Sequence, residues 1–324
     1  MMLNHSIPTG DLMTKTLKLH YPVYAPDGNV LISAGTTLTD QIIADLTCAS
    51  QKENFDILKV MHHGSIAASL HRICDTPPYD KIFSKRSRTK SLFAMLETVE
   101  LPAPLLGIID FFKTNDPYTY RHILIVFALS MLLAQDIIGD AYDLQTAGQA
   151  CTTHDIGKYC IPIAVLKKTS RLGQAERVYL EHHSAAGYVL LSYFFKDSRS
   201  PAAITARDHH ERCDGSGYPC GISLNNRIVE IVAVCDVFDA LIAQRPYRPT
   251  AYDLRTALEE ITDMAARGAI PWDIAKALVN YNRKKRVPVH ACVVSREKRG
   301  KPPGDNLYRT IGSAGSDPDS PVEA

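Results

Sequence analysis

The chain has 324 residues, which is long enough for one large domain or two smaller ones, each with its own core. Its apolar fraction of 45% and charged fraction of 22% are typical of a folded globular protein and exclude extensive disorder. A formal net charge of +1 argues against a broad basic surface, so we expect neither a DNA or RNA partner nor non-specific membrane binding.

The N-terminal residues predict a small α/β module. Residues 17–25 and 29–35 are rich in β-forming residues and flank a Pro-Asp-Gly turn, which favours a hairpin. The Thr-Leu-Thr-Asp sequence at 37–40 can cap a following amphipathic helix. We assign residues 1–74 to this hairpin-plus-helix module, and residues 75–91, with two prolines and five basic residues, to a linker or exposed loop.

The apolar spacing from about residue 92 to 280 is helical nearly throughout and predicts a mostly α domain, which we assign to residues 92–285, with its motifs between 115 and 280. The expected helices lie at 92–112, 118–138, 143–158, 173–195, 201–210, 227–243 and 251–280. Residues 286–324 are polar and rich in Gly, Pro and Ser, so we expect a disordered tail.

The cysteines and the apolar runs indicate in which cellular compartment the protein is expected. The 8 cysteines are scattered without a Cys-x-x-Cys pair, and no secretory leader is expected, which indicates reduced thiols in a cytoplasmic protein. The longest apolar run, residues 123–134, is interrupted by Ser130 and is too short to cross a bilayer. We therefore expect no membrane insertion.

Five of the helical segments carry histidine or aspartate in otherwise apolar surroundings. The candidates are His122, His154, Asp155, His183, His209, His210 and Asp236. A single residue of this kind is usually a hydrogen-bonded core residue, but several uncompensated charges in one core cost several kcal/mol per ion. A bound cation removes that cost, and helical bundles commonly build metal sites from inward-facing histidines and carboxylates.

The donor types narrow the choice of metal. Imidazole nitrogens and carboxylate oxygens, without cysteine, suit iron, manganese, zinc or a similar divalent ion. Seven ligands are too many for one tetrahedral zinc and favour two ions ~3.5–4 Å apart, with Asp155 as a bridge. Lys158 would follow His154 by one turn if the helix continues, where it could contact a phosphate or simply be an exposed lysine at a helix end.

Two long motifs, HDIGK at 154–158 and HHERCDGSGYP at 209–219, together resemble those of the HD-GYP family, a branch of the HD phosphohydrolase superfamily. The flanking DVFDAL at 236–241 and RPYR at 245–248 agree with this resemblance, which covers about residues 115–280. It implies an HD-type helical bundle domain after the N-terminal module. It also implies a phosphodiesterase that converts cyclic di-GMP to linear pGpG, GMP or both, by attack of a metal-bridging hydroxide.

The resemblance assigns the ligands to two metals. One metal would take His122, His154, Asp155 and Asp236, and the other would take Asp155, His183, His209 and His210. His183 is preferred to His182 because the family ligand precedes a glycine by four residues, here Gly187. Members with a third metal use a glutamate where this chain has Tyr118, so we expect two divalent ions, iron or manganese.

The resemblance also implies catalytic and substrate-binding roles. Asp155 and Lys158 would be catalytic, and Lys158, Arg245 and Arg248 would contact the substrate phosphates. An alternative for the two arginines is a structural one, in which ion pairs with Asp239 or Glu211 anchor the RPYR loop.

Two other functions stay open at this point. One is a cyclic dinucleotide receptor or interaction module with little turnover, since the family associates its GYP loop with partners such as diguanylate cyclase (GGDEF) proteins. The other is a hydrolase of a different cyclic dinucleotide, such as cyclic GMP-AMP. The enzyme is favoured because every ligand position is filled.

Overall fold

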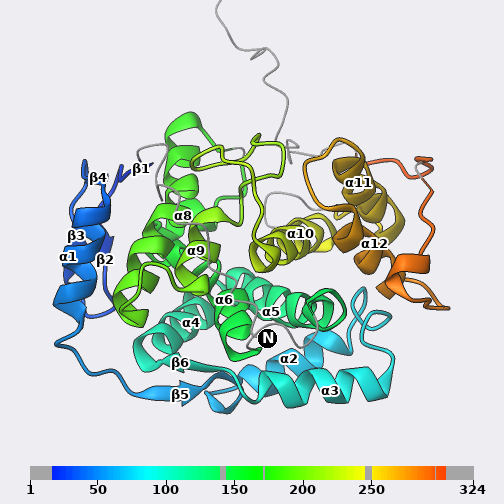
Figure 1. Ribbon diagram of the computed structural model, residues 1–324, viewed down its shortest axis with the longest axis horizontal. Coiled ribbons are helices and arrows are strands. Elements are labelled where there is room, and N and C mark those ends of the chain that lie inside the picture. Colours follow the sequence, from blue (N-terminus) through cyan, green and yellow to red (C-terminus); the bar gives the residue numbers. More distant parts are fainter. Residues whose placement is uncertain (1–16, 139–143, 171, 245–249, 296, 304–324) are drawn as a thin grey trace, which may run out of the picture.

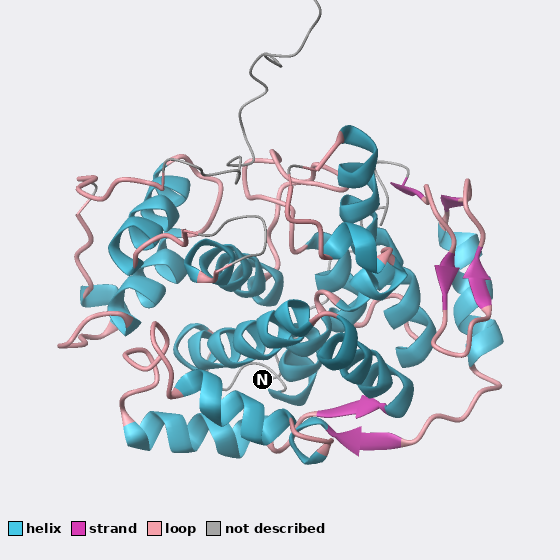
Figure 2. Ribbon diagram, turned by 180° about the vertical axis from the view of Figure 1, so that it is seen from behind, coloured by secondary structure: helices cyan, strands magenta, loops and turns pink. Residues whose placement is uncertain are grey.

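The computed structural model describes residues 17–138, 144–170, 172–244, 250–295 and 297–303. Helices dominate this part of the chain, and its strands are two or three residues long (Figures 1 and 2). The predicted mostly α class is therefore confirmed.

The N-terminal hairpins and helix form as expected. They comprise β1 (Leu17–Lys18), β2 (Val23–Tyr24), β3 (Val30–Ile32), β4 (Thr37–Leu38) and α1 (Asp40–Ser50). Strand β2 pairs antiparallel with β3 across a turn in which Gly28 has φ 85°, a conformation that favours glycine, and β1 pairs with β4. Thr39 caps α1 by accepting a hydrogen bond from the Ile42 amide at 3.3 Å. This module lies at one end of the molecule, against α8 (Gln174–Phe195) (Figure 1).

The segment that follows the module packs against the helical body. It comprises β5 (Ile57–Lys59), η1 (Val60–His62), α2 (Ile66–Cys74), α3 (Arg86–Leu96) and β6 (Glu100–Pro102), and β5 pairs with β6. The stretch 75–91, expected to be a linker or exposed loop, instead buries Tyr79, Ile82 and Phe83 and contains the start of α3. Ile82 and Phe83 follow Tyr79 by three and four positions, so the three side chains can point to the same side. The prolines and basic residues around them gave the stretch the composition of an exposed loop.

Nine helices of the described chain form the body of the molecule. They are α4 (Ala103–Asn115), α5 (Pro117–Ile137), α6 (Leu144–Thr153), α7 (Ile163–Leu166), α8, α9 (Pro201–Asp208), α10 (Arg227–Ile242), α11 (Leu254–Ala266) and α12 (Trp272–Tyr281), with short turns η3 (Ile156–Cys160) and η4 (Val289–Ala291). Helices α5 and α10 pack together and are buried along most of their length. Two expected helices are divided. The expected helix 92–112 is interrupted by β6 between α3 and α4, where Pro102 precedes the first residue of α4. The expected helix 251–280 is divided because Gly268 has φ 80° and Pro271 caps the next helix.

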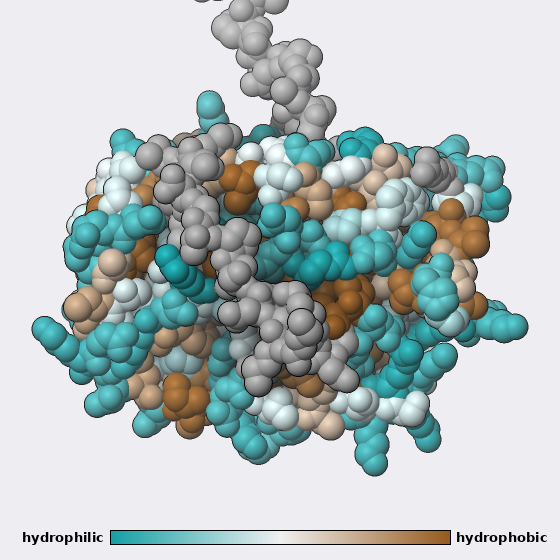
Figure 3. Space-filling model, viewed as in Figure 1, coloured by the Kyte–Doolittle hydropathy of each residue, from teal (hydrophilic) through white to brown (hydrophobic). Residues whose placement is uncertain are grey.

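Helix α5 is long and apolar enough to cross a membrane by length and composition alone, but most of its apolar stretch is buried among other helices. A central helix of a folded domain has the same properties. On the face drawn in Figure 3, hydrophobic residues form small separate patches among hydrophilic ones. These observations agree with α5 as a core helix.

The C-terminal segment is only partly described. Residues 304–324 of the expected disordered tail lie outside the described residues. The preceding residues differ from the expectation, because Cys292 is buried next to η4 and the Gly300 amide donates to Glu259 Oε2 at 2.7 Å.

Candidate metal centre

The structure brings all seven candidate ligands together from five segments of the body. Helix α5 supplies His122, the end of α6 supplies His154 and Asp155, α8 supplies His183, the end of α9 supplies His209 and His210, and α10 supplies Asp236. Six of them are buried, and His210 is partly exposed. These elements meet near the middle of the molecule (Figure 1).

The Asp155 carboxylate lies between two groups of imidazoles. Its Oδ2 is 3.2 Å from His122 Nε2 and 3.6 Å from His154 Nε2. Its Oδ1 is 3.4 Å from His183 Nε2 and 3.7 Å from His209 Nε2. Each oxygen thus faces a different pair of nitrogens, which is the arrangement that a carboxylate bridging two cations requires.

Asp236 lies beside both groups. Its Oδ1 is 3.1 Å from His122 Nε2, and its Oδ2 is 3.8 Å from His210 Nδ1. The tightest sets of donor atoms, each within 4.8 Å of one another, consist of His122, His154 and Asp155 and of Asp155, His183, His209 and His210. Asp236 therefore occupies the edge of the first set and is close to the second.

Two glycines permit the close approach of these elements. A Cβ atom on Gly157 would lie 2.0 Å from the His183 carbonyl oxygen and 2.4 Å from the Gly187 nitrogen. Without a side chain, η3 packs directly on α8, and this contact places Asp155 next to His183. The glycine four residues after His183 thus has a packing reason.

The ring nitrogens that face away from the centre are held by acceptors. The Nδ1 atoms of His154, His183 and His209 lie against the carbonyls of Cys151, Leu180 and Thr205. The His122 Nδ1 atom lies 2.7 Å from Asp239 Oδ2. Such contacts fix the ring orientation and leave the Nε2 lone pair for a metal.

The protonation states fit a divalent cation. Burial lowers the pKa of His154 to about 4 and that of His183 to about 3, so both rings are neutral near neutral pH. Burial would raise the pKa of Asp155, but Lys158 and the nearby imidazoles hold it well below its ordinary value. Neutral imidazoles and ionised carboxylates are the forms that bind metals.

Unpaired buried nitrogens support the same fit. The Nε2 atoms of His122 and His154 have no hydrogen-bond partner of acceptable geometry in the described part of the chain. Burial would lower the pKa of His122, but its contacts with Asp155, Asp236 and Asp239 raise it well above its ordinary value, which favours a protonated ring that a bound cation must deprotonate. A cation at this position would satisfy both nitrogens and neutralise the carboxylates.

Lys158 lies beside the candidate metal centre, but on a different element from the expected helix. Helix α6 ends at Thr153 and does not continue to Lys158, which lies on η3. Its Nζ is 2.5 Å from Asp155 Oδ2, and its side chain is 16% exposed. The ammonium group is therefore fixed beside Asp155 and can still be reached from solvent.

Asp239 is a residue whose role the sequence did not reveal. It is fully buried, and its Oδ1 accepts a hydrogen bond from the Tyr79 hydroxyl while its Oδ2 contacts His122. Its position three residues after Asp236 on α10 was the available signal, since it places both carboxylates on one face. Arg245 and Arg248, the arginines of the alternative ion pairs with Asp239 or Glu211, lie outside the described residues.

The Gly-Tyr-Pro turn folds back on the histidine pair. Glu211 is fully buried and accepts hydrogen bonds from the amides of Cys220, Gly221 and Ile222 at 2.6, 2.9 and 3.1 Å. The Tyr218 ring stacks on His210 with 4.5 Å between ring centroids. Glu211 therefore holds the end of the loop, and Tyr218 covers one face of a candidate ligand.

His182 and Tyr118, which the sequence did not assign as ligands, are in contact with other aromatic rings. His182 is buried, contacts the Tyr21 ring edge-on at 5.5 Å, and has no hydrogen-bond partner among the residues described. The Tyr118 ring lies parallel to His122 at 6.2 Å between centroids. Neither belongs to the two tight sets of donors.

Comparison with known proteins identifies relatives that match part of the chain. A cyclic di-GMP phosphodiesterase of Pseudomonas aeruginosa is 36% identical over 45% of this chain and 36% of its own length. The cyclic di-GMP phosphodiesterase response regulator of Xanthomonas campestris is 40% identical over 36% of this chain and 32% of its own. A 3'3'-cGAMP-specific phosphodiesterase of Vibrio cholerae is 30% identical over 58% of this chain and 41% of its own. The matches thus span less than half the length of each relative.

A family model described as an HD domain matches residues 108–270, about half of the chain. This range contains all seven candidate ligands, and the family together with the His/Asp cluster indicates divalent metal binding. The chain belongs to the HD domain family, in its HD-GYP branch.

Proposed function

We propose that this protein is a metal-dependent phosphodiesterase that hydrolyses cyclic di-GMP to linear pGpG, GMP or both. The observation that carries the proposal is the Asp155 carboxylate, which lies between two groups of buried imidazoles with Lys158 beside it. The names of two relatives, both cyclic di-GMP phosphodiesterases, support this substrate.

Two divalent ions, iron or manganese, fit the donors. His122, His154, Asp155 and Asp236 would hold one ion, and Asp155, His183, His209 and His210 would hold the other. When bound, such ions polarise a phosphoryl oxygen and make water a better nucleophile at neutral pH. The nitrogen and oxygen donors, without a cysteine in either set, agree with this choice of metal.

Asp155 and Lys158 have distinct tasks in this proposal. Asp155 fixes the separation of the two donor groups, because each of its oxygens faces one of them. Lys158 is a partly exposed cation beside Asp155, so it can stabilise negative charge that develops on a phosphate oxygen. Arg245 and Arg248, which lie outside the described residues, remain the proposed contacts to the substrate phosphates.

The Gly-Tyr-Pro loop supports a protein partner, and the cysteines support a cytoplasmic location. Asp214 and Ser216 are exposed at the tip of the Gly-Tyr-Pro loop, which is accessible to a partner such as a diguanylate cyclase (GGDEF) protein. All eight cysteines are free, which supports a reducing compartment, the cytoplasm.

Anaerobic purification followed by metal analysis and a cyclic di-GMP assay tests the proposal. Two equivalents of metal with turnover are the expected result, whereas two equivalents without turnover would favour a receptor. Cyclic GMP-AMP is a second candidate substrate because one relative is specific for it. Chromatography of the products from each dinucleotide, with manganese or iron under reducing conditions, distinguishes the two substrates.

A further inference from the structure

Two basic segments that are far apart in the sequence lie side by side at one end of the molecule. The Arg286 guanidinium donates hydrogen bonds to the carbonyl oxygens of Lys81 at 3.2 Å and of Ile82 at 2.6 Å. The first of these contacts spans 205 positions and joins the stretch before α3 to the turn after α12. Both segments lie at the end of the molecule opposite the N-terminal module (Figure 1).

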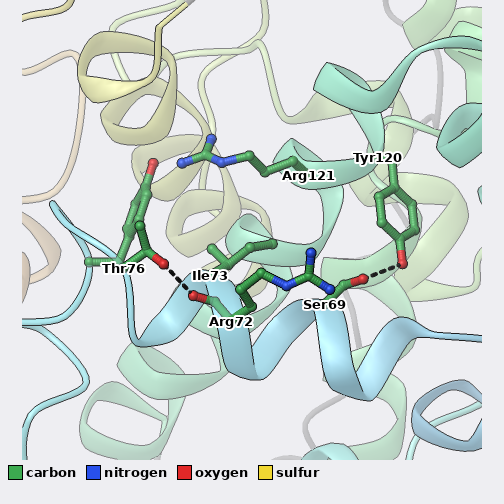
Figure 4. Close-up of a pocket in the computed structure, with 7 residues that line it drawn as sticks. Ser69, Arg72, Ile73, Thr76, Tyr120 and Arg121 are labelled. Carbon is green, nitrogen blue, oxygen red and sulfur yellow. Dashed lines mark hydrogen bonds between the residues drawn. The ribbon is translucent and has the colours of Figure 1, made fainter.

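The arginines that build this junction are engaged in structural contacts. Arg286 also lies over the Tyr281 ring, 4.8 Å from its centroid, and Arg88 donates to Asp136 Oδ2 at 2.8 Å. Arg121, which extends from α5 in the cavity that Figure 4 shows, is paired in a similar way with a buried aspartate of α10 at 3.8 Å. These three guanidinium groups stabilise the fold, so they are not free to bind a partner.

The remaining cations of the two segments are exposed. Lys81, Lys85, Lys284 and Lys285 are exposed and take part in no ion pair within the described ranges of the chain. Arg283 is also exposed, and its guanidinium donates to a backbone carbonyl at 2.6 Å. We call these five residues the basic patch.

Nearby carboxylates leave the charge of the basic patch uncompensated. Asp136 is already bound by an arginine of α3, and Asp75 and Asp80 line a hollow together with Arg86 and Lys90, where the charges balance. The net charge of +1 hides the patch, because it sums acidic and basic residues over the whole chain. The expectation that the protein does not bind membranes rests on that sum, whereas binding depends on the local potential.

An exposed apolar side chain lies beside the basic patch. Val293 is 81% exposed, and its carbonyl oxygen is the acceptor for Arg283. An apolar side chain among cations allows electrostatic attraction to a bilayer to be combined with insertion at the level of the headgroups. This combination is typical of a surface that binds membranes.

The residue types favour a membrane over a nucleic acid. Four of the five residues in the basic patch are lysines, which are flexible point charges and lack the planar fork with which arginine pairs with bases. The aromatic residues of the two segments, Tyr79, Phe83 and Tyr281, are buried. The patch therefore offers no aromatic ring of these segments on which a base could stack.

We propose that the basic patch and Val293 bind the surface of a membrane that contains anionic lipids. The five cations contact lipid phosphates, and the Val293 side chain enters the headgroup layer. This binding is peripheral. None of the six residues belongs to the candidate metal centre, so the proposal does not depend on the phosphodiesterase activity.

Cosedimentation of the full chain with lipid vesicles tests the proposal. Vesicles of phosphatidylcholine with phosphatidylglycerol should bind the protein, vesicles of phosphatidylcholine alone should not, and added salt should weaken the binding. Each cation near an anionic leaflet contributes about fivefold to the affinity, so the double variant Lys284→Ala, Lys285→Ala should bind about 20-fold more weakly. Val293→Ser should weaken binding about fivefold.

Two further double variants separate local charge from net charge. Lys52→Ala, Lys113→Ala removes the same charge from exposed lysines outside the basic patch and should bind vesicles as the unaltered chain does. Lys284→Arg, Lys285→Arg retains the charge and should retain the binding.

Three results would overturn the proposal. The first is equal vesicle affinity of the two alanine double variants. The second is the absence of measurable binding to the anionic vesicles, or equally strong binding to phosphatidylcholine alone. The third is tighter binding of RNA or duplex DNA than of vesicles, with the same dependence on Lys284 and Lys285, which would assign the patch to a nucleic acid.

Discussion

Substitution of Asp239 by asparagine should weaken metal binding without altering any of the seven candidate ligands. Asp239 is fully buried, and its two oxygens contact the Tyr79 hydroxyl and His122 Nδ1. An asparagine retains one acceptor but loses the charge and replaces the other oxygen with a donor. Loss of such a contact to a ligand histidine typically lowers metal affinity by about 10- to 100-fold.

The same substitution should also destabilise the fold. One buried group, either the Tyr79 hydroxyl or the His122 Nδ1–H, loses its acceptor, which costs about 1–3 kcal/mol. Urea unfolding of the metal-depleted protein measures the loss in the free energy of unfolding separately from metal binding. Competition with a chelator of known affinity measures the metal dissociation constant.

Asp136→Asn provides a matched control. Asp136 accepts hydrogen bonds from the Tyr281 hydroxyl at 2.7 Å and from Arg88, so it has similar partners away from the centre. This variant should lose stability but retain the metal affinity of the unaltered chain. If Asp239→Asn and Asp136→Asn bound metal equally well, the orienting role of Asp239 would be refuted.

Three further changes have defined outcomes. Lys158→Ala should lower turnover about 10²–10³-fold while the metal content stays unchanged, and an equal loss of metal would assign Lys158 a structural role instead. Gly157→Ala should reduce stability by about 1–3 kcal/mol, because its Cβ would lie 2.0 Å from the His183 carbonyl oxygen; urea unfolding indistinguishable from that of the original chain would contradict the packing argument. Metal removal by a chelator should lower Tm, since an ion present at 100 times its Kd contributes about 2.7 kcal/mol, and an unchanged Tm would count against a preformed site.

The sequence predicted the convergence of the candidate ligands because each lies in a motif or helix with a clear local signal. His183 and Asp236 fall inside long helices that are largely buried, and His209 lies at a helix end next to a turn. Their role as metal ligands is still a prediction, whereas their proximity is an observation.

The Tyr79–Asp239 contact and the end of α6 were not predicted, because the spacing of apolar residues carries no information about either. The Tyr79 hydroxyl reaches Asp239 across 160 positions of sequence, and the stretch around Tyr79 had the composition of an exposed loop. The end of α6 before His154 was also missed, because the apolar spacing continues through η3 while the backbone tightens. Long-range pairing and local backbone geometry were therefore the parts that required the structure.

The central claim is that Asp155 joins two metal ions in a hydrolytic site. The most direct test purifies the original chain and Asp155→Ala anaerobically. Metal content and cyclic di-GMP turnover are then measured on both proteins. The account predicts two equivalents of metal with turnover in the original chain, and depleted metal without turnover in the variant. An Asp155→Ala protein that has lost its metal but still hydrolyses cyclic di-GMP at the normal rate would contradict it.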